Sequence, residues 1–307
     1  MKMKYEEFKS YVKENIKDYL SDEYADCEVE YQHIVKSGYE YDGLMVREKG
    51  KVSIAPALNV TEAFKNYENG DDLEEIMERL ADCRMTATMG NFDKNDILVY
   101  EKAKARLYPR LINTSCNGVY IADKPHREIE DLSVVYAVRI FEDNHGFGDA
   151  VVTDDLAKVW GVSEAELYDT AVRNLGKTEP LFQNLEEALF GIMSGADDKE
   201  SSKIEDINIE DYSAPFFVLT NKQKTKGASM VLNVDVMKRI SEKLGGFYIL
   251  PSSVDEVLII PKGAADRGVD ELKNLVEMVN CNEVRPEDQL SNNVYEYDVD
   301  KGTIVIA

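Results

Sequence analysis

The sequence has few of the residues that cross-link a chain or bind a metal. Its 307 residues include 3 His and 4 Cys, and the cysteines are far apart without a CxxC pair: Cys27, Cys83, Cys116 and Cys281. That spacing argues against a structural zinc site and against a disulfide framework. A P-loop and a dinucleotide-binding glycine motif are also missing. We therefore expect no metal and no cofactor, and a reducing cytoplasm as the location.

Long apolar runs and an excess of positive charge are missing as well. No stretch approaches the roughly 18 apolar residues of a membrane span, and the N-terminal residues are too charged for a signal peptide. The 36 Lys and Arg are outnumbered by 59 Asp and Glu, which gives a net charge of −23 at pH 7. Because duplex binding depends on Lys and Arg displacing counterions, direct nucleic-acid binding is disfavoured. The basic stretches Lys102–Arg110 and Lys222–Lys226 have too few aromatic residues to bind single strands and are interpreted as solvated faces.

What is present is the composition of a folded protein, with 44% hydrophobic residues. Patterns of helices and strands alternate without a regular βαβ order, which favours an α+β fold of mostly antiparallel sheets with flanking helices. We expect two or three blocks along the chain. They are an N-terminal helix, strand meander and two helices over 1–92, a central α+β block over 93–193, an acidic linker or loop over 194–213, and a C-terminal α+β block over 214–307.

Within the first block, apolar residues at helical spacing predict a helix over Tyr5–Leu20. Alternation of apolar and polar residues then predicts a strand that starts at Cys27. Two helices should follow the meander, the first with Thr61 as its N-cap and the second with Asp71 or Asp72.

In the later blocks, strands are expected at RLYPRLIN, at VYIAD and in a hairpin that pairs DLSVVYAVRIF with GFGDAVVT. Thr153 should cap the next helix, and Ser163 with Glu166 should form a capping box on the one after it. The C-terminal block should contain strands at PFFVLTN, ASMVLN, FYILPSS and VDEVLIIP, helices at DVMKRISEKLGG and GVDELKNLVEMVNC, and a final hairpin.

Pro125 and His126 form the first candidate site. Pro125 fixes the chain before His126, and carboxylates follow at Glu128, Glu130 and Asp131. A carboxylate beside an imidazole raises the pKa of the ring and makes it a proton shuttle, or both groups bind a divalent cation. The alternative is a polar turn that begins a strand. The lack of a second His or Cys at ligand spacing favours the turn.

The second candidate is the bend within FYILPSSVDEVLIIP. Small hydroxyls and carboxylates lie there between two apolar runs: Ser252, Ser253, Asp255 and Glu256. A serine becomes a nucleophile only beside a general base, and no His or Lys is close in sequence. The favoured interpretation is therefore turn chemistry, in which Ser hydroxyls satisfy backbone groups at a strand break.

Stretches spread along the chain resemble a family of unknown function from gut-dwelling anaerobic bacteria. They include YDGLMVREKG, LINTSCNGVYIADKPH, VWGVSEAELY and FFVLTNKQKTKGASM, and the resemblance covers nearly the whole chain. It implies a bacterial cytoplasmic setting and no particular activity. Members of that family often carry His where this chain has Asp255, which weakens a role of this position as a base. The positions that match its motifs are Pro125, His126, Asn221, Gly227, Ser252 and Ser253.

Three functions from different classes fit these observations. The leading hypothesis is a non-catalytic binding or interaction protein with an unknown protein partner, without direct nucleic-acid binding and without a membrane. The second is a hydrolase-like enzyme whose site lies where the Pro-Ser-Ser bend meets Asn221 and His126. The third is an inhibitor whose acidic surface mimics nucleic acid and occupies the basic groove of a DNA-binding enzyme.

Overall fold

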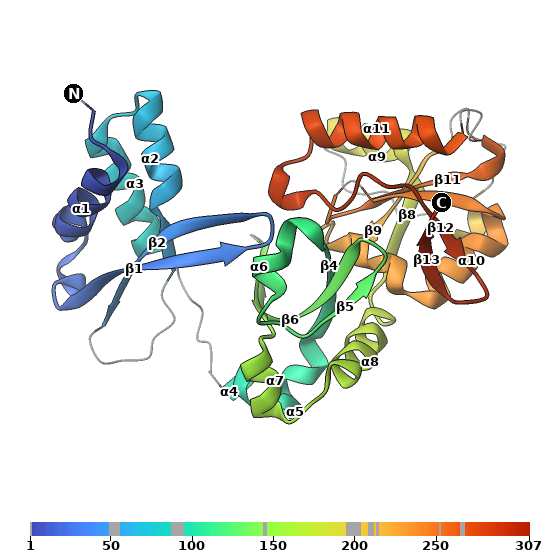
Figure 1. The fold of residues 1–307 in the computed structure, drawn as a ribbon, viewed down its shortest axis with the longest axis horizontal. Coiled ribbons are helices and arrows are strands. Elements are labelled where there is room, and N and C mark those ends of the chain that lie inside the picture. The colour runs from blue at the N-terminus through green and yellow to red at the C-terminus, as the bar shows by residue number, and fades with distance from the viewer. Residues whose placement is uncertain are drawn as a thin grey trace. The chain divides into compact units, whose positions relative to one another are not determined.

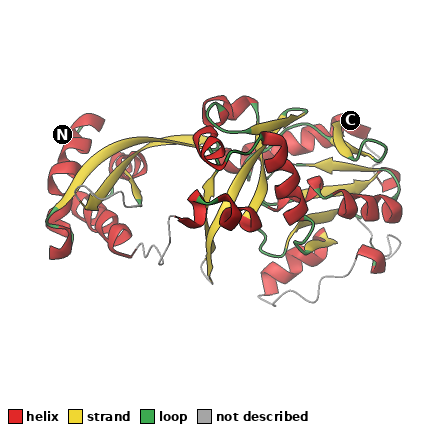
Figure 2. Cartoon of the chain, turned by 90° about the horizontal axis from the view of Figure 1, so that it is seen from below, coloured by secondary structure: helices red, strands yellow, loops and turns green. Residues whose placement is uncertain are grey.

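The chain forms two compact units, Met1–Phe92 and Asp93–Ala307 (Figure 1). The computed structural model describes residues 2–48, 56–86, 95–143, 146–194, 204–207, 212, 215–251, 253–264 and 268–307. Helices and strands occur in both units (Figure 2), and the pairs between described strands are antiparallel. The expected α+β fold is therefore confirmed. No helix among the described residues has the length and apolar character needed to cross a bilayer.

Unit 1 packs helices on a three-stranded sheet in the order β1-β2-β3. Its elements are α1 (Tyr5–Asn15), β1 (Cys27–Lys36), β2 (Tyr39–Glu48), β3 (Ala57–Asn59), α2 (Val60–Asn69) and α3 (Leu73–Thr86). A 3₁₀ turn over Ile16–Tyr19 follows α1, so the helix predicted over Tyr5–Leu20 is present in two pieces. The apolar helix faces meet the sheet in one core that includes Phe8, Leu44 and Ile76.

The helix caps of unit 1 differ in part from the prediction. Asn59 caps α2, because its side-chain oxygen accepts the backbone N–H of Glu62 at 3.0 Å. Thr61 as the cap is therefore wrong, and its hydroxyl accepts the backbone N–H of Asp42 at 2.9 Å instead. At α3 the cap is Asp72, whose carboxylate accepts the N–H of Glu74 at 2.9 Å.

Unit 2 contains two sheets. A four-stranded sheet has the order β4-β6-β5, with β7 also paired to β6, and a six-stranded sheet has the order β13-β12-β10-β11-β9-β8. The strands are β4 (Leu107–Asn113), β5 (His126–Ile129), β6 (Leu132–Asp143), β7 (Gly146–Val151), β8 (Pro180–Asn184), β9 (Phe217–Asn221), β10 (Phe247–Leu250), β11 (Val257–Pro261), β12 (Tyr295–Asp298) and β13 (Thr303–Ile306). The helices are α4 (Asn95–Leu98), α5 (Tyr100–Ala103), α6 (Gly118–Ile121), α7 (Asp154–Trp160), α8 (Glu164–Leu175), α9 (Leu185–Ser194), α10 (Val234–Leu244) and α11 (Gly268–Asn282).

Several local predictions in unit 2 are confirmed. The hairpin of β6 and β7 pairs as expected, and the final hairpin is β12 with β13. Thr153 caps α7, and Ser163 forms the predicted capping box with Glu166 at the start of α8.

Two predicted strands are helical instead. VYIAD lies largely in α6, and ASMVLN lies largely in the 3₁₀ helix η7 (Gly227–Leu232), so both strand assignments are wrong. Each is a short apolar run, and such runs cannot be assigned by periodicity alone. The residues of η7 are buried throughout, which explains why no exposed polar face at helical spacing marks them as a helix.

One hydrophobic core joins the two sheets of unit 2. It extends from Leu107 and Tyr136 in the four-stranded sheet to Leu219 and Tyr295 in the six-stranded sheet. Most of the predicted linker over 194–213 is outside the described residues, but Ile204 and Ile207 of that stretch are buried in this core.

Asp131, in the turn between β5 and β6, makes a polar connection between the sheets. It accepts hydrogen bonds from Ser291 Oγ at 2.6 Å, from Asn293 Nδ2 at 3.1 Å and from the Tyr295 hydroxyl. Nearby, Asn113 Nδ2 donates to the carbonyl oxygen of Leu290 at 2.6 Å. Together these bonds fix the segment before β12 against the four-stranded sheet.

Candidate functional site at the bend between β10 and β11

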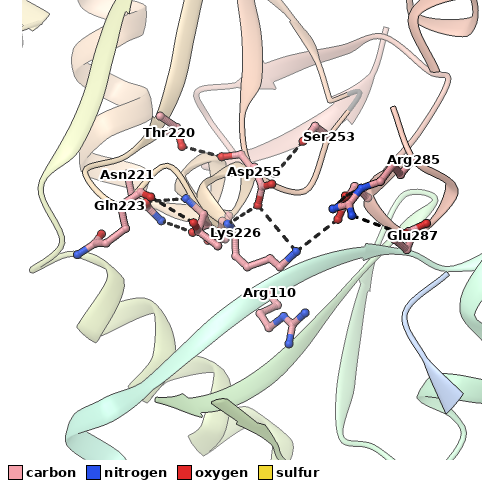
Figure 3. A network of polar contacts seen from close by, with 12 residues as sticks. Arg110, Thr220, Asn221, Gln223, Lys226, Ser253, Asp255, Arg285 and Glu287 are labelled. Carbon is pink, nitrogen blue, oxygen red and sulfur yellow. Dashed lines mark hydrogen bonds and ion pairs between the residues drawn. The ribbon is translucent and has the colours of Figure 1, made fainter. Parts of the chain in front are cut away.

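The bend after β10 lies beside the loop after β9 because their strands pair. Val257 of β11 is opposite Leu219 of β9 in an antiparallel register. The residues just before Val257 are therefore next to the residues just after Leu219. A third segment joins them, because the backbone of Ser253 forms an isolated bridge with Gln289. Figure 3 shows the polar network built by these three segments.

Asp255 is at the centre of this network. Its carboxylate Oδ1 accepts the backbone N–H of Lys226 at 2.7 Å, and its carbonyl oxygen accepts the hydroxyl of Thr220 at 2.6 Å. Asn221 also bonds to this loop at both polar atoms of its side chain. Its Nδ2 donates to the carbonyl oxygen of Thr225 at 2.8 Å, and its Oδ1 accepts the backbone N–H of Thr225 at 3.3 Å. Asp255 and Asn221 therefore hold the loop between β9 and η7 in one shape.

Lys226 brings a positive charge between two carboxylates. Its Nζ is 3.8 Å from Asp255 Oδ1 and 3.6 Å from Asp288 Oδ1. Arg285 donates from Nε and from one terminal nitrogen to the other oxygen of Asp288, at 3.0 and 2.6 Å. The side chain of Asp288 is only 15% exposed, so water screens these pairs incompletely. Charges of both signs thus connect all three segments.

Lys226 has a left-handed backbone, with φ at 53°. This conformation is uncommon for a residue with a side chain and disfavoured outside glycine, asparagine and aspartate. The bond from its N–H to Asp255 helps to keep it there. The next residue, Gly227, has no room for a side chain, because an added Cβ would lie 2.6 Å from the carbonyl oxygen of Asp255.

Ser253 and Glu256 are the groups at the bend that resemble catalytic residues. Ser253 is 8% exposed, and its hydroxyl oxygen accepts the backbone N–H of Asp255 at 3.0 Å. Burial raises the pKa of Glu256, the charges of Asp255 and Asp288 raise it further, and a hydrogen bond with Ser253 lowers it. Ser252 is outside the described residues.

Arg110 approaches the network from β4 (Figure 3). Its guanidinium is 3.2 Å from Asp149, whose carboxylate also accepts the Tyr108 hydroxyl. Burial lowers the pKa of Arg110, but the charges of Asp149, of nearby tyrosines and of Asp255 raise it more, so the net shift is upward. Arg110 and Lys226 are 15% and 23% exposed, and the prediction that they belong to solvated faces is wrong for both.

Pro125 and His126 have a different setting, where β5 begins. His126 Nδ1 donates to the carbonyl oxygen of Lys124 at 2.8 Å, so Nδ1 carries the proton in the neutral ring. Among the described residues no carboxylate forms a hydrogen bond or ion pair with this ring, and no hydrogen bond joins His126 to Ser253 or Asp255. The structure thus joins Asn221, Ser253, Asp255 and Glu256 without adding His126.

Sequence reasoning missed the cations of the network and Asp288. Arg110 had a detectable signal, because it is a charge inside the otherwise apolar strand β4 between two buried positions, Pro109 and Leu111. Lys226 is one lysine among three in a polar loop, and only the tertiary fold distinguishes it. No group of three or more His, Cys, Asp or Glu able to hold a metal occurs in the described part of the chain.

Fold and site define an α+β protein of two units in which hydrogen bonds and ion pairs connect the bend at residues 253–255 to the loop after β9 and to Asp288. The chain belongs to the family of unknown function DUF5688, whose sequence model matches residues 5–299. Comparisons with curated proteins and with solved structures gave no match.

Proposed function

We propose that the protein is a non-catalytic binding or interaction protein and that the bend is a structural brace. The observation that carries this proposal is the state of Ser253. Its hydroxyl is buried and bonded to the backbone N–H of Asp255, with no histidine beside it among the described residues. A serine nucleophile needs a base that takes its proton and space for a substrate. The hydroxyl is too buried to meet a substrate, and the side chain bonded to it among the described residues is the carboxyl group of Glu256 rather than a histidine.

The proposal extends to the setting in which the protein acts. All four cysteines are free, and Cys83, Cys116 and Cys281 are exposed. Exposed free thiols persist in a reducing compartment and are oxidised outside it. These thiols support a cytoplasmic location.

A hydrolase-like enzyme is the second candidate, and Glu256 is the observation that favours it. A carboxyl group with a raised pKa beside a serine is able to donate a proton to a leaving group. In that case Ser253 would have to leave its bond with the Asp255 backbone and become exposed to substrate.

A fluorophosphonate probe, which reacts with activated serines, separates the two candidates. We expect no covalent label on the purified wild-type protein after hours at pH 7, with Ser253→Ala and Glu256→Gln behaving identically. Label that is mapped to Ser253 and lost in Ser253→Ala would contradict the non-catalytic proposal. Turnover of ester or phosphoester substrates that Ser253→Ala abolishes would contradict it as well.

A further inference from the structure

A cavity in unit 2 shares no residue with the network at the bend. Its volume is about 410 Å³, and its walls come from the start of β4, from β6 and from the end of α8. Cavities that bind small ligands measure about 300–1,000 Å³, so this one is large enough for a small molecule. The positions of β4, β6 and α8 are shown in Figure 1.

The walls carry positive charge and no negative side chain. Arg106 and Arg139 line the cavity, and no Asp or Glu lines the part of it that the structure describes. This is unusual in a chain with 59 acidic and 36 basic residues. The charged side chains of these walls therefore differ in sign from most charged side chains of the chain.

Arg106 provides an uncompensated charge. Its terminal nitrogens donate to two backbone carbonyl oxygens, that of Asp96 at 2.8 Å and that of Ile140 at 3.5 Å. Both acceptors are neutral, and no carboxylate among the described residues forms an ion pair with Arg106. These bonds orient the guanidinium without neutralising it, and further N–H groups stay available for an anion. Arg139 is close by, with its guanidinium carbon 5.5 Å from the centre of the Tyr108 ring.

The remaining walls favour an apolar body on the ligand. Ile140 and the aromatic Tyr108 line the cavity with partly exposed side chains, while Leu107 and Leu175 lie behind them as buried members of the core. The carbonyl groups at the end of α8 disfavour an anion, but a helix end carries only about half an elementary charge, which is less than the full positive charge of Arg106.

We propose that this cavity is a binding site for a small organic anion. A carboxylate or phosphate group of the ligand binds to Arg106 and Arg139, and its apolar part contacts Ile140 and the ring of Tyr108. The inference goes beyond the proposed function, because it holds whether or not the bend is catalytic.

Titration of the full-length protein followed by amide NMR tests this site with three probes: phenylacetate, phenyl phosphate and neutral phenylacetamide. We expect saturable 1:1 binding of at least one anion, with shifts centred on the amides of Asn174 and Thr178, and at least tenfold weaker binding of phenylacetamide. The anion that binds more tightly distinguishes a carboxylate ligand from a phosphate ligand. Failure of both anions to bind at millimolar concentration would overturn the proposal.

Variants separate this site from general charge attraction. Arg106→Gln and Arg139→Gln should each weaken anion binding about tenfold or more, since each removes a charge-assisted contact. Arg173→Gln is the matched control, because it removes an equal charge from an exposed position of α8 and should leave the affinity unchanged. If Arg106→Gln fails to fold, Arg139→Gln still decides the question. Equal affinities in Arg139→Gln and Arg173→Gln would refute the site.

Discussion

At the scale of single residues, Gly227 allows three segments to meet. An added Cβ would overlap the hydroxyl of Thr220 and would lie 2.7 Å from the backbone nitrogen of Asn221 and 2.6 Å from the carbonyl oxygen of Asp255. Two of these three atoms belong to backbone, which cannot move away without shifting a strand. The bonds that surround Asp255 therefore depend on the absence of a side chain at Gly227.

Gly227→Ala should destabilise unit 2 by about 1–3 kcal/mol or more, because the extra methyl group overpacks a buried site. Gly118→Ala is the control, since nothing lies within 4 Å of a Cβ there and its backbone is helical. In a helix, alanine is more favourable than glycine by up to about 1 kcal/mol. Urea unfolding of both variants measures the difference. Equal stability of the two variants would show that the loop yields easily at Gly227.

The residues at the bend also show what the sequence was able to predict. Proline, small hydroxyls and carboxylates between two apolar runs indicated a turn with side-chain bonds, and Ser253 makes such a bond to the N–H of Asp255. The partners of Asp255 were not predictable, because Lys226 and Asp288 are about 30 residues away on either side. Contacts over such separations depend on strand order, which local patterns do not specify.

At the scale of elements, sequence signals confined to one turn of a helix predicted the structure correctly. Features that depend on contact with another element were not predicted. The capping box of Ser163 and Glu166 is complete within four residues and was identified. Thr61 was a reasonable cap by type, but Asn59 is the cap, and Thr61 bonds to Asp42 of β2 instead. The run ASMVLN had the composition of a strand, and its burial as η7 in the core of unit 2 determines its structure.

Asp42 connects the elements of unit 1. Its carboxylate accepts hydrogen bonds from Lys9 Nζ at 2.8 Å and from the Tyr5 hydroxyl at 2.9 Å, both on α1. On the neighbouring strand, His33 Nδ1 is 3.4 Å away. The bond from Lys9 is the largest of the effects that lower the pKa of Asp42, burial opposes it, and the bonds from Tyr5 and His33 add to the lowering.

A lowered pKa in the folded state makes Asp42 a source of pH-dependent stability. The contribution is complete above the unfolded pKa of about 3.8 and is lost as the pH falls through the lower, folded pKa. Asp42→Asn should therefore destabilise unit 1 by about 1–3 kcal/mol at pH 7, and the difference from wild type should shrink below about pH 4. Denaturant unfolding from pH 7 to pH 2.5 measures this difference. Glu14→Gln, at an exposed position without a described partner, should show no such trend. If the difference in unfolding free energy between Asp42→Asn and wild type stayed constant with pH, Asp42 would not be a source of pH-dependent stability.

At the scale of the whole molecule, burial is divided between separate cores. Unit 1 encloses one core around Phe8, Leu44 and Ile76, and unit 2 encloses a large core that includes Tyr136 and Leu219 and a smaller one that includes Leu250 and Leu272. Strand pairs and buried clusters of the described residues stay within one unit or the other. A change in the core of one unit should therefore leave the packing of the other unit intact.

Calorimetry of the full chain tests this independence. Unfolding enthalpy scales with chain length, so we expect two transitions, with unit 2 absorbing roughly twice the heat of unit 1. Leu44→Ala and Leu219→Ala are matched variants, because each truncates a leucine that is 0% exposed. Each variant should lower the unfolding free energy of its own unit by about 2–5 kcal/mol. Leu44→Ala should lower the temperature of the smaller transition alone, and Leu219→Ala that of the larger one alone. A single transition that both variants shift equally would mean that the two units unfold as one cooperative body, because only coupled cores respond to each other's cavities.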